Sequence, residues 1–177
     1  MAKNQLGDPV ANRAGPRDRV VALRQVFEAE REWLFRAWTD PLEFTKWWGP
    51  KGWNAFDCAL DARPGGRWSS SFARPGQPSI HVGGIYHEVV APELLVFSWD
   101  SYGAGAADSL SLVRIEFIAL GPHTELVLTH RELTTGEAYD MDVGWLSAFE
   151  CLAAYIAGPA ALASVKPTST PCEVKQR

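Results

Sequence analysis

The chain has 177 residues, of which 46% are hydrophobic, and its formal net charge is −4. This length and composition suit one globular domain with a substantial core, and the acidic balance disfavours binding to the phosphate backbone of nucleic acids. The three cysteines form no CxxC pair, the N-terminus has no apolar signal segment, and no stretch approaches the roughly 20 apolar residues of a membrane span. We therefore expect a cytoplasmic protein that does not insert into membranes.

Both ends of the chain are polar and punctuated by Gly and Pro, without hydrophobic periodicity. Such composition cannot bury enough apolar surface to order the backbone. The sequence predicts flexible tails over residues 1–18 and 159–177, and a single folded domain over residues 19–158.

The domain is expected to begin with a strand and two short helices. Residues 19–28 are rich in Val and Leu and partly alternate, as in a strand, and the apolar residues of 34–38 follow helical spacing. Asp40 is placed to cap a second short helix that has Pro41 at its first position. Glu43, three residues after the cap, completes the pattern of a capping box.

From Trp53 onward the hydrophobic pattern changes to a period of two, with turn residues between the runs, which indicates a sheet. The short connections favour antiparallel pairing, because parallel crossovers need a dozen residues or more. The alternating apolar residues of 113–117 are expected to face a covering helix, with Arg114 and Glu116 on the solvated side. The predicted strands are 53–61, 67–73, 80–90, 94–99, 109–119 and 124–132.

A long amphipathic helix is predicted over residues 136–157, where apolar residues recur at spacings of three and four. Gly158-Pro159 is typical of a helix C-terminus. A sheet with one apolar face needs a cover, and a helix of roughly 30 Å is long enough to supply it. We therefore predict an α+β fold, in which a curved antiparallel sheet of six or seven strands wraps around the C-terminal helix and two short helices follow the first strand.

Short motifs rich in Trp, Gly and Pro follow one another along the chain: Ala37–Pro41, Trp47–Trp53, Asp61–Trp68, Gly84–Leu95, Thr124–His130 and Gly144-Trp145. In this order they resemble the family of activator-of-heat-shock-protein-90-ATPase homologues, over about residues 19–158. The resemblance implies membership of the START-like (SRPBCC) superfamily with its helix-grip fold. It also implies a deep cavity between sheet and long helix for apolar molecules such as lipids, hormones or polyketides, and no particular reaction.

The cavity walls are expected to be mainly aromatic, because eight Trp and eight Phe are available and aromatic side chains are common in ligand pockets. Trp47 and Trp48 are adjacent and cannot both face one core from a helix. Either one of them lines the cavity mouth, or Trp47 is core and Trp48 a packing lid over the first strand. The expected lining residues are Trp47, Trp48, Trp68, Phe72, Tyr86, Glu88, Trp99, His130, Trp145 and Phe149.

Three of these residues are polar, and each allows two interpretations. Strand alternation places Tyr86 and Glu88 on one face. A Glu88 carboxylate inside a cavity would have a raised pKa and could act as acid or base, whereas at the strand end it would be solvated. Tyr86 and His130 can contribute to a pocket or serve as hydrogen-bonded structural residues.

No metal site or cofactor motif is found in the sequence. His81 and His87 share a strand face but lie roughly 20 Å apart along an extended chain, too far to bind one ion. No Gly-rich phosphate loop or nucleophile elbow precedes a helix. We expect no metal and no cofactor.

Three functions are compatible with these observations. The first is a binding protein without catalysis, which holds a small apolar or amphipathic ligand between sheet and helix. The second is a cyclase or hydrolase for an aromatic or polyketide-like compound, in which Tyr86, Glu88 or His130 acts as acid or base. The third is a co-chaperone-like module that binds a chaperone partner. A homodimer would be favoured by an exposed aromatic patch near Trp48 or Trp53.

Overall fold

The computed structural model describes residues 16–102 and 111–162. The predicted tails lie almost wholly outside these ranges and stay predictions. The α+β fold and the order of its elements are confirmed. The elements are β1 (Arg19–Phe27), α1 (Arg31–Thr39), α2 (Pro41–Trp47), β2 (Asn54–Leu60), β3 (Arg67–Ala73), β4 (Ile80–Val90), β5 (Leu94–Tyr102), β6 (Ser111–Leu120), β7 (His123–Leu133) and α3 (Thr135–Leu162).

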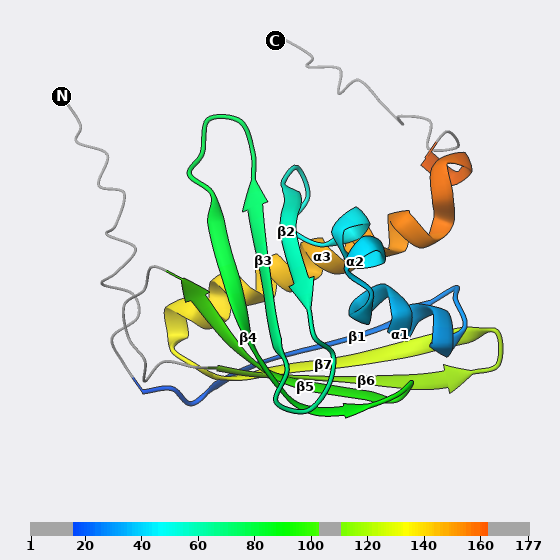
Figure 1. Ribbon diagram of the computed structural model, residues 1–177, viewed down its shortest axis with the longest axis horizontal. Helices are drawn as coiled ribbons and strands as arrows, with labels where there is room; N and C mark the ends of the chain where they lie inside the picture. The colour runs from blue at the N-terminus through cyan, green and yellow to red at the C-terminus, as the bar shows by residue number, and fades with distance from the viewer. Residues whose placement is uncertain (1–15, 103–110, 163–177) are drawn as a thin grey trace, which may run out of the picture.

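The seven strands form one antiparallel sheet in the order β1-β7-β6-β5-β4-β3-β2. The sheet bends so strongly that β2 and β3 rise steeply from the plane of β6 and β7, and α3 runs along the hollow that results (Figure 1). Helix α3 packs against β1, β7 and α2, while α1 packs against β6. This arrangement places α2 between edge strand β2 and the C-terminal half of α3.

Two features interrupt the regular elements. Pairing between β2 and β3 shifts register between Phe56 and Ala59, and Asp57, which lies in this bulge, has a φ of 51°. Helix α3 kinks at Gly158, where φ is 68°, before its last turn. The sequence therefore located the end of the straight helix correctly, although helical structure continues to Leu162.

The alternation of β6 separates core from solvent as predicted. Val113, Ile115 and Phe117 are at most 2% exposed. On the opposite face Arg114 donates a hydrogen bond of 2.8 Å to Glu116. Period two alone decides this orientation, because the strand contains no bulge in its pairing with either neighbour.

The predicted capping box of α2 forms only in part. The Asp40 carboxylate accepts a hydrogen bond of 2.8 Å from the backbone N–H of Leu42, as an N-cap should. Glu43 does not reach back to the cap, because its carboxylate is bound by Lys46 and by Tyr155 of α3. The prediction that Glu43 completes the capping box is therefore wrong. Glu43 instead connects α2 to α3 through Tyr155.

The turn after α2 requires a glycine. Gly49 has a φ of 112°, and a Cβ at this position would lie 2.9 Å from Cδ1 of Phe72. Both a left-handed backbone and contact with a buried ring exclude larger residues. Gly49 therefore determines where the chain leaves α2, after the C-cap residue Trp48, and turns toward β2.

Replacement of Gly49 by Ala is expected to lower the free energy of unfolding by about 2–4 kcal/mol, because backbone strain adds to overlap with Phe72. Gly144→Ala is the control, since a Cβ at this helical position meets nothing within 4 Å. This second change should leave stability equal or slightly higher, as Ala is the better helix former. Urea denaturation of both variants measures the difference, and equal stabilities would contradict the role given to Gly49.

Candidate functional site

The space predicted to be a deep central cavity is largely filled by its own aromatic walls. The ring of Trp48 lies 5.6–5.9 Å from the rings of Phe72, Trp99 and Trp145, and Trp68 lies 5.2 Å from Trp99. The void left in the interior has a volume of about 10 Å³. It is bordered by Trp38, Phe44, Trp48, Trp68, Tyr86, Leu95 and Phe97. A space of this size holds about one water molecule and no larger ligand.

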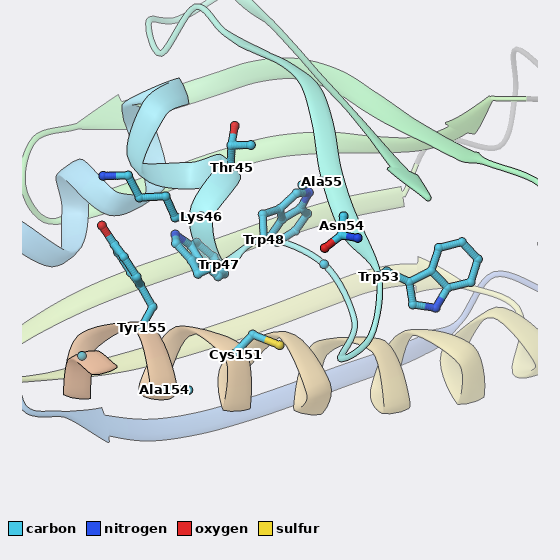
Figure 2. A pocket seen from close by; sticks show the side chains of 12 residues that line it. Thr45, Lys46, Trp47, Trp48, Trp53, Asn54, Ala55, Cys151, Ala154 and Tyr155 are labelled. Atoms are coloured by element: carbon cyan, nitrogen blue, oxygen red, sulfur yellow. The ribbon is translucent and has the colours of Figure 1, made fainter. Parts of the chain in front are cut away.

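A groove of about 510 Å³ lies outside this cluster, between α2, β2 and the C-terminal half of α3. Ligand sites in proteins commonly measure 300–1,000 Å³. Trp47 and Trp48 form the middle of its wall, with α3 beneath them (Figure 2). The full lining is Thr45, Lys46, Trp47, Trp48, Gly49, Trp53, Asn54, Ala55, Cys151, Ala154, Tyr155 and Gly158.

One end of the groove is polar. Lys46 and Tyr155 approach each other there from opposite sides (Figure 2). Lys46 forms an ion pair of 3.0 Å with Glu43, and the Tyr155 hydroxyl donates a hydrogen bond to the same carboxylate. These bonds lower the pKa of Glu43, and the hydrogen bond to Glu43 raises the pKa of Tyr155. At neutral pH this end therefore presents an ammonium group and a protonated phenol.

The rest of the groove is mainly apolar. Trp53 lies at the opposite end, and the guanidinium of Arg74 lies 5.1 Å from its ring. The Cys151 thiol is directed at the space from α3 (Figure 2). Burial, followed by the charge of Glu150, raises the pKa of Cys151, so the thiol is protonated and weakly nucleophilic at neutral pH. The groove offers apolar contact with polar groups at one end.

Glu88 does not face the interior, contrary to the expectation from alternation. Pairing between β4 and β5 shifts register between Tyr86 and Glu88. The irregularity places Glu88 among the exposed residues, while Tyr86 is buried. Burial, with a smaller effect of Asp61, raises the pKa of Tyr86 well above its usual value. The two residues therefore do not act together at one site.

His130 points inward, as expected, and is 0% exposed. Its Nδ1 accepts a hydrogen bond of 3.0 Å from the indole of Trp145. A Trp indole can only donate, so the proton of the neutral imidazole lies on Nε2 and is donated to Ser111 Oγ at 2.7 Å. Ser111 in turn donates to the backbone carbonyl of Trp99 at 3.3 Å. Every member of this chain is satisfied, and none is aimed at the groove.

The predicted lining residues therefore divide into two groups. Trp47 and Trp48, of which only one was expected at a cavity mouth, both border the groove and both also belong to the buried core cluster. The remaining aromatic residues, Trp68, Phe72, Tyr86, Trp99, Trp145 and Phe149, belong to the packed core.

The contribution of α3 to the groove was not predicted from the sequence. Ala154 and Tyr155 lie three and four residues after Cys151, and Gly158 lies four and three residues after them, which places all four on one helix face. The hydrophobic pattern of the sequence did not indicate this face, because the face includes small and polar residues. Lys46 and Trp53 were also missed, since neither belongs to a pattern that marks a pocket.

Among residues 16–102 and 111–162, no cluster of three or more His, Cys, Asp or Glu side chains is arranged to hold a metal ion. None of the described helices is both long enough and apolar enough to cross a membrane. The groove itself is characterised by its shape, its aromatic surface and the polar groups at one end.

Comparison with solved structures shows the same fold in bacterial proteins. The AHSA1 protein from Silicibacter pomeroyi is 28% identical and superposes with a TM-score of 0.69 over 78% of this chain and 98% of its own. A protein from Chromobacterium violaceum is 25% identical, with a TM-score of 0.69 over 77% and 96% of the two chains. CalU16 from Micromonospora echinospora is 24% identical, with a TM-score of 0.59 over 82% and 80%.

Comparison with curated proteins gave no match. The family model described as activator of Hsp90 ATPase homolog 1-like protein matches residues 28–157, which includes every element from α1 to the straight part of α3. The resemblance inferred from the Trp, Gly and Pro motifs is thereby confirmed, and the chain belongs to the activator of Hsp90 ATPase homolog 1-like family.

Proposed function

We propose that this protein binds a small amphipathic molecule in the groove between α2, β2 and α3. The observation that supports this most directly is a space of about 510 Å³ with two Trp side chains in its wall, beside an interior that is otherwise packed. Aromatic walls supply apolar contact and shape, while a few polar groups orient the ligand.

The expected ligand has an apolar, preferably aromatic body and a hydrogen-bonding or anionic end. The body fits between Trp48, Ala55 and Ala154, and the polar end lies beside Lys46 and Tyr155. Lys46 carries three N–H donors and uses one in its ion pair with Glu43, so it can bind a further acceptor. The fold of the family is compatible with such binding, and the lining of the groove supports this class of ligand.

Substitution of Ala154 by Phe is expected to block the groove. The probe is 1-anilinonaphthalene-8-sulfonate, an amphipathic aromatic anion whose fluorescence rises in apolar surroundings. The wild-type protein should bind one molecule, and Ala154→Phe should weaken binding at least tenfold because the new ring occupies the space.

Val143→Phe is the matched control, since Val143 is 53% exposed, does not line the groove and lies about three turns from Ala154 along the same helix. This variant should bind the probe like the wild type, and both variants should show the wild-type circular dichroism spectrum. Unchanged binding by Ala154→Phe would place the ligand elsewhere and contradict the proposed function.

An enzyme in the same fold would need an acid or base in contact with the ligand. Among the predicted candidates, Glu88 is exposed, while Tyr86 and His130 are held inside the core. Burial, with a smaller effect of Arg17, lowers the pKa of His130 to about 3. The imidazole is therefore neutral at physiological pH, and its hydrogen bonds are taken by Trp145 and Ser111. These observations favour binding over catalysis by these three residues.

The buried His130 predicts acid sensitivity of the fold. Below its ordinary pKa of 6.5 the unfolded chain takes up a proton that the folded chain, with a pKa of about 3, does not. Unfolding therefore becomes easier as the pH falls, by about 1.4 kcal/mol per pH unit from this group. The advantage of the wild type over His130→Gln should shrink by about 2 kcal/mol between pH 7 and pH 5 in urea denaturation. A constant difference would show that His130 is not held neutral by the fold.

A protein partner stays a prediction, and such a partner would bind to a surface other than the groove. Trp48, at 4% exposure, is not part of an exposed patch, which removes one of the signs expected for a dimer near this residue. Apolar side chains are exposed on α3 instead, at Tyr139, Val143 and Leu146. Their spacing of four and three places them on one face of the helix.

A further inference from the structure

Two indole N–H groups beside the interior void have no acceptor. Within the described residues, Nε1 of Trp38 and Nε1 of Trp48 are buried and make no hydrogen bond. The two side chains are only 2% and 4% exposed. Both rings border the void of about 10 Å³. An indole can only donate, so the group that is needed here is an acceptor.

Trp48 also lines the groove, so the groove and the void share this residue. A molecule in the groove already lies against one side of the Trp48 ring. Trp48 is thus the common wall of the groove and the void, and a ligand group that passes its ring edge would enter the void beside the buried indole donor.

The chemistry of the void favours an acceptor that has no hydrogens of its own. Of the other polar side chains that border it, Trp68 already donates to the backbone carbonyl of Ser98 at 3.0 Å. Tyr86 adds a single hydroxyl. A water molecule here could accept from both indoles, but only the Tyr86 oxygen, among the side chains that border the void, could receive its two O–H groups. A carbonyl oxygen accepts two hydrogen bonds and donates none.

The oxygen should also be uncharged. Among the described residues that border the void, none is cationic, and burial of an unpaired carboxylate is strongly unfavourable. The ammonium of Lys46 lies at the polar end of the groove, beside Tyr155, and belongs to a different part of the site. The inner end of the ligand therefore differs from its outer end: a neutral acceptor inside, and a polar or anionic group outside.

We propose that the molecule bound in the groove carries a neutral carbonyl oxygen that accepts a hydrogen bond from the indole N–H of Trp48, with Trp38 as a second donor. This inference rests on the proposed function of the groove. It defines the ligand class further, as ketones, quinones, esters or amides with an aromatic or apolar body.

The test compares 9-fluorenone with fluorene, two neutral tricyclic probes of the same outline that differ in one carbonyl oxygen. By isothermal titration calorimetry the wild-type protein should bind fluorenone about tenfold more tightly, because only the ketone pairs the buried donor. In ¹H–¹⁵N spectra the indole resonance of Trp48, assigned through Trp48→Phe, should move downfield with fluorenone and not with fluorene.

Two variants test the residue itself. Trp48→Phe removes the N–H and should abolish the preference for fluorenone, whereas Trp53→Phe, a change elsewhere in the groove, should preserve it. Because Trp48 is buried among other rings, a third protein carries β-(3-benzothienyl)alanine at position 48, which keeps the bicyclic shape and replaces the N–H by sulfur. This protein should bind both probes with equal affinity.

The outcomes separate the two proposals. If the wild-type protein binds 1-anilinonaphthalene-8-sulfonate but neither tricycle, the carbonyl inference is overturned while the proposed function stands. If it binds none of the three, both are overturned. If it binds both with equal affinity, the groove is a ligand site but the carbonyl inference is wrong. If the preference for fluorenone survives the loss of the N–H at position 48, the acceptor is bound by another group and the role of Trp48 is overturned.

Discussion

The packing of Trp48 is the interaction on which the site depends. Its ring is stacked on Phe44 of α2 at 4.5 Å, contacts Phe72 of β3 at 5.9 Å and contacts Trp145 of α3 at 5.6 Å. One side chain thus joins the short helices, the sheet and the long helix. Aromatic pairs of this kind stabilise a fold beyond their buried area and hold their partners in defined orientations. The same ring separates the packed interior from the groove.

This core contains buried polar groups that are hydrogen-bonded and buried polar groups that are not. The chain of Trp145, His130 and Ser111 is fully hydrogen-bonded, so it stabilises one arrangement of α3 over β6 and β7. The indoles of Trp38, Trp48 and Trp99 are buried without an acceptor, which costs about 1–3 kcal/mol each. Of these three, Trp38 and Trp48 border the interior void.

The fold was predictable because its main signals are local. Strict alternation in β6, helical spacing in α3 and the glycine turn after α2 each act within a few residues. Glu88 was placed on the wrong face because a register shift depends on how two strands pair, which one strand's pattern does not show.

The site was less predictable, since it depends on contacts between distant segments. Glu43 is bound by Tyr155, which lies 112 residues away. Whether aromatic side chains leave a cavity or fill it depends on how the rings interlock, and composition does not decide this. Trp47 and Trp48 are both buried in one aromatic cluster. This is possible because α2 ends at Trp47 and Trp48 has extended backbone, so the helical spacing assumed from the sequence does not apply to this pair.

The bulge at Asp57 has a consequence for what this edge of the sheet can receive. An edge strand with a regular ladder is a template for another strand, and it invites association between copies of a chain. In β2 the irregularity between Phe56 and Ala59 breaks the row of free backbone groups, and the exposed Asp57 adds a charge. Asn54 and Ala55 precede the bulge and face the groove. The edge therefore resists the addition of a polypeptide strand while its first residues stay open to a small molecule.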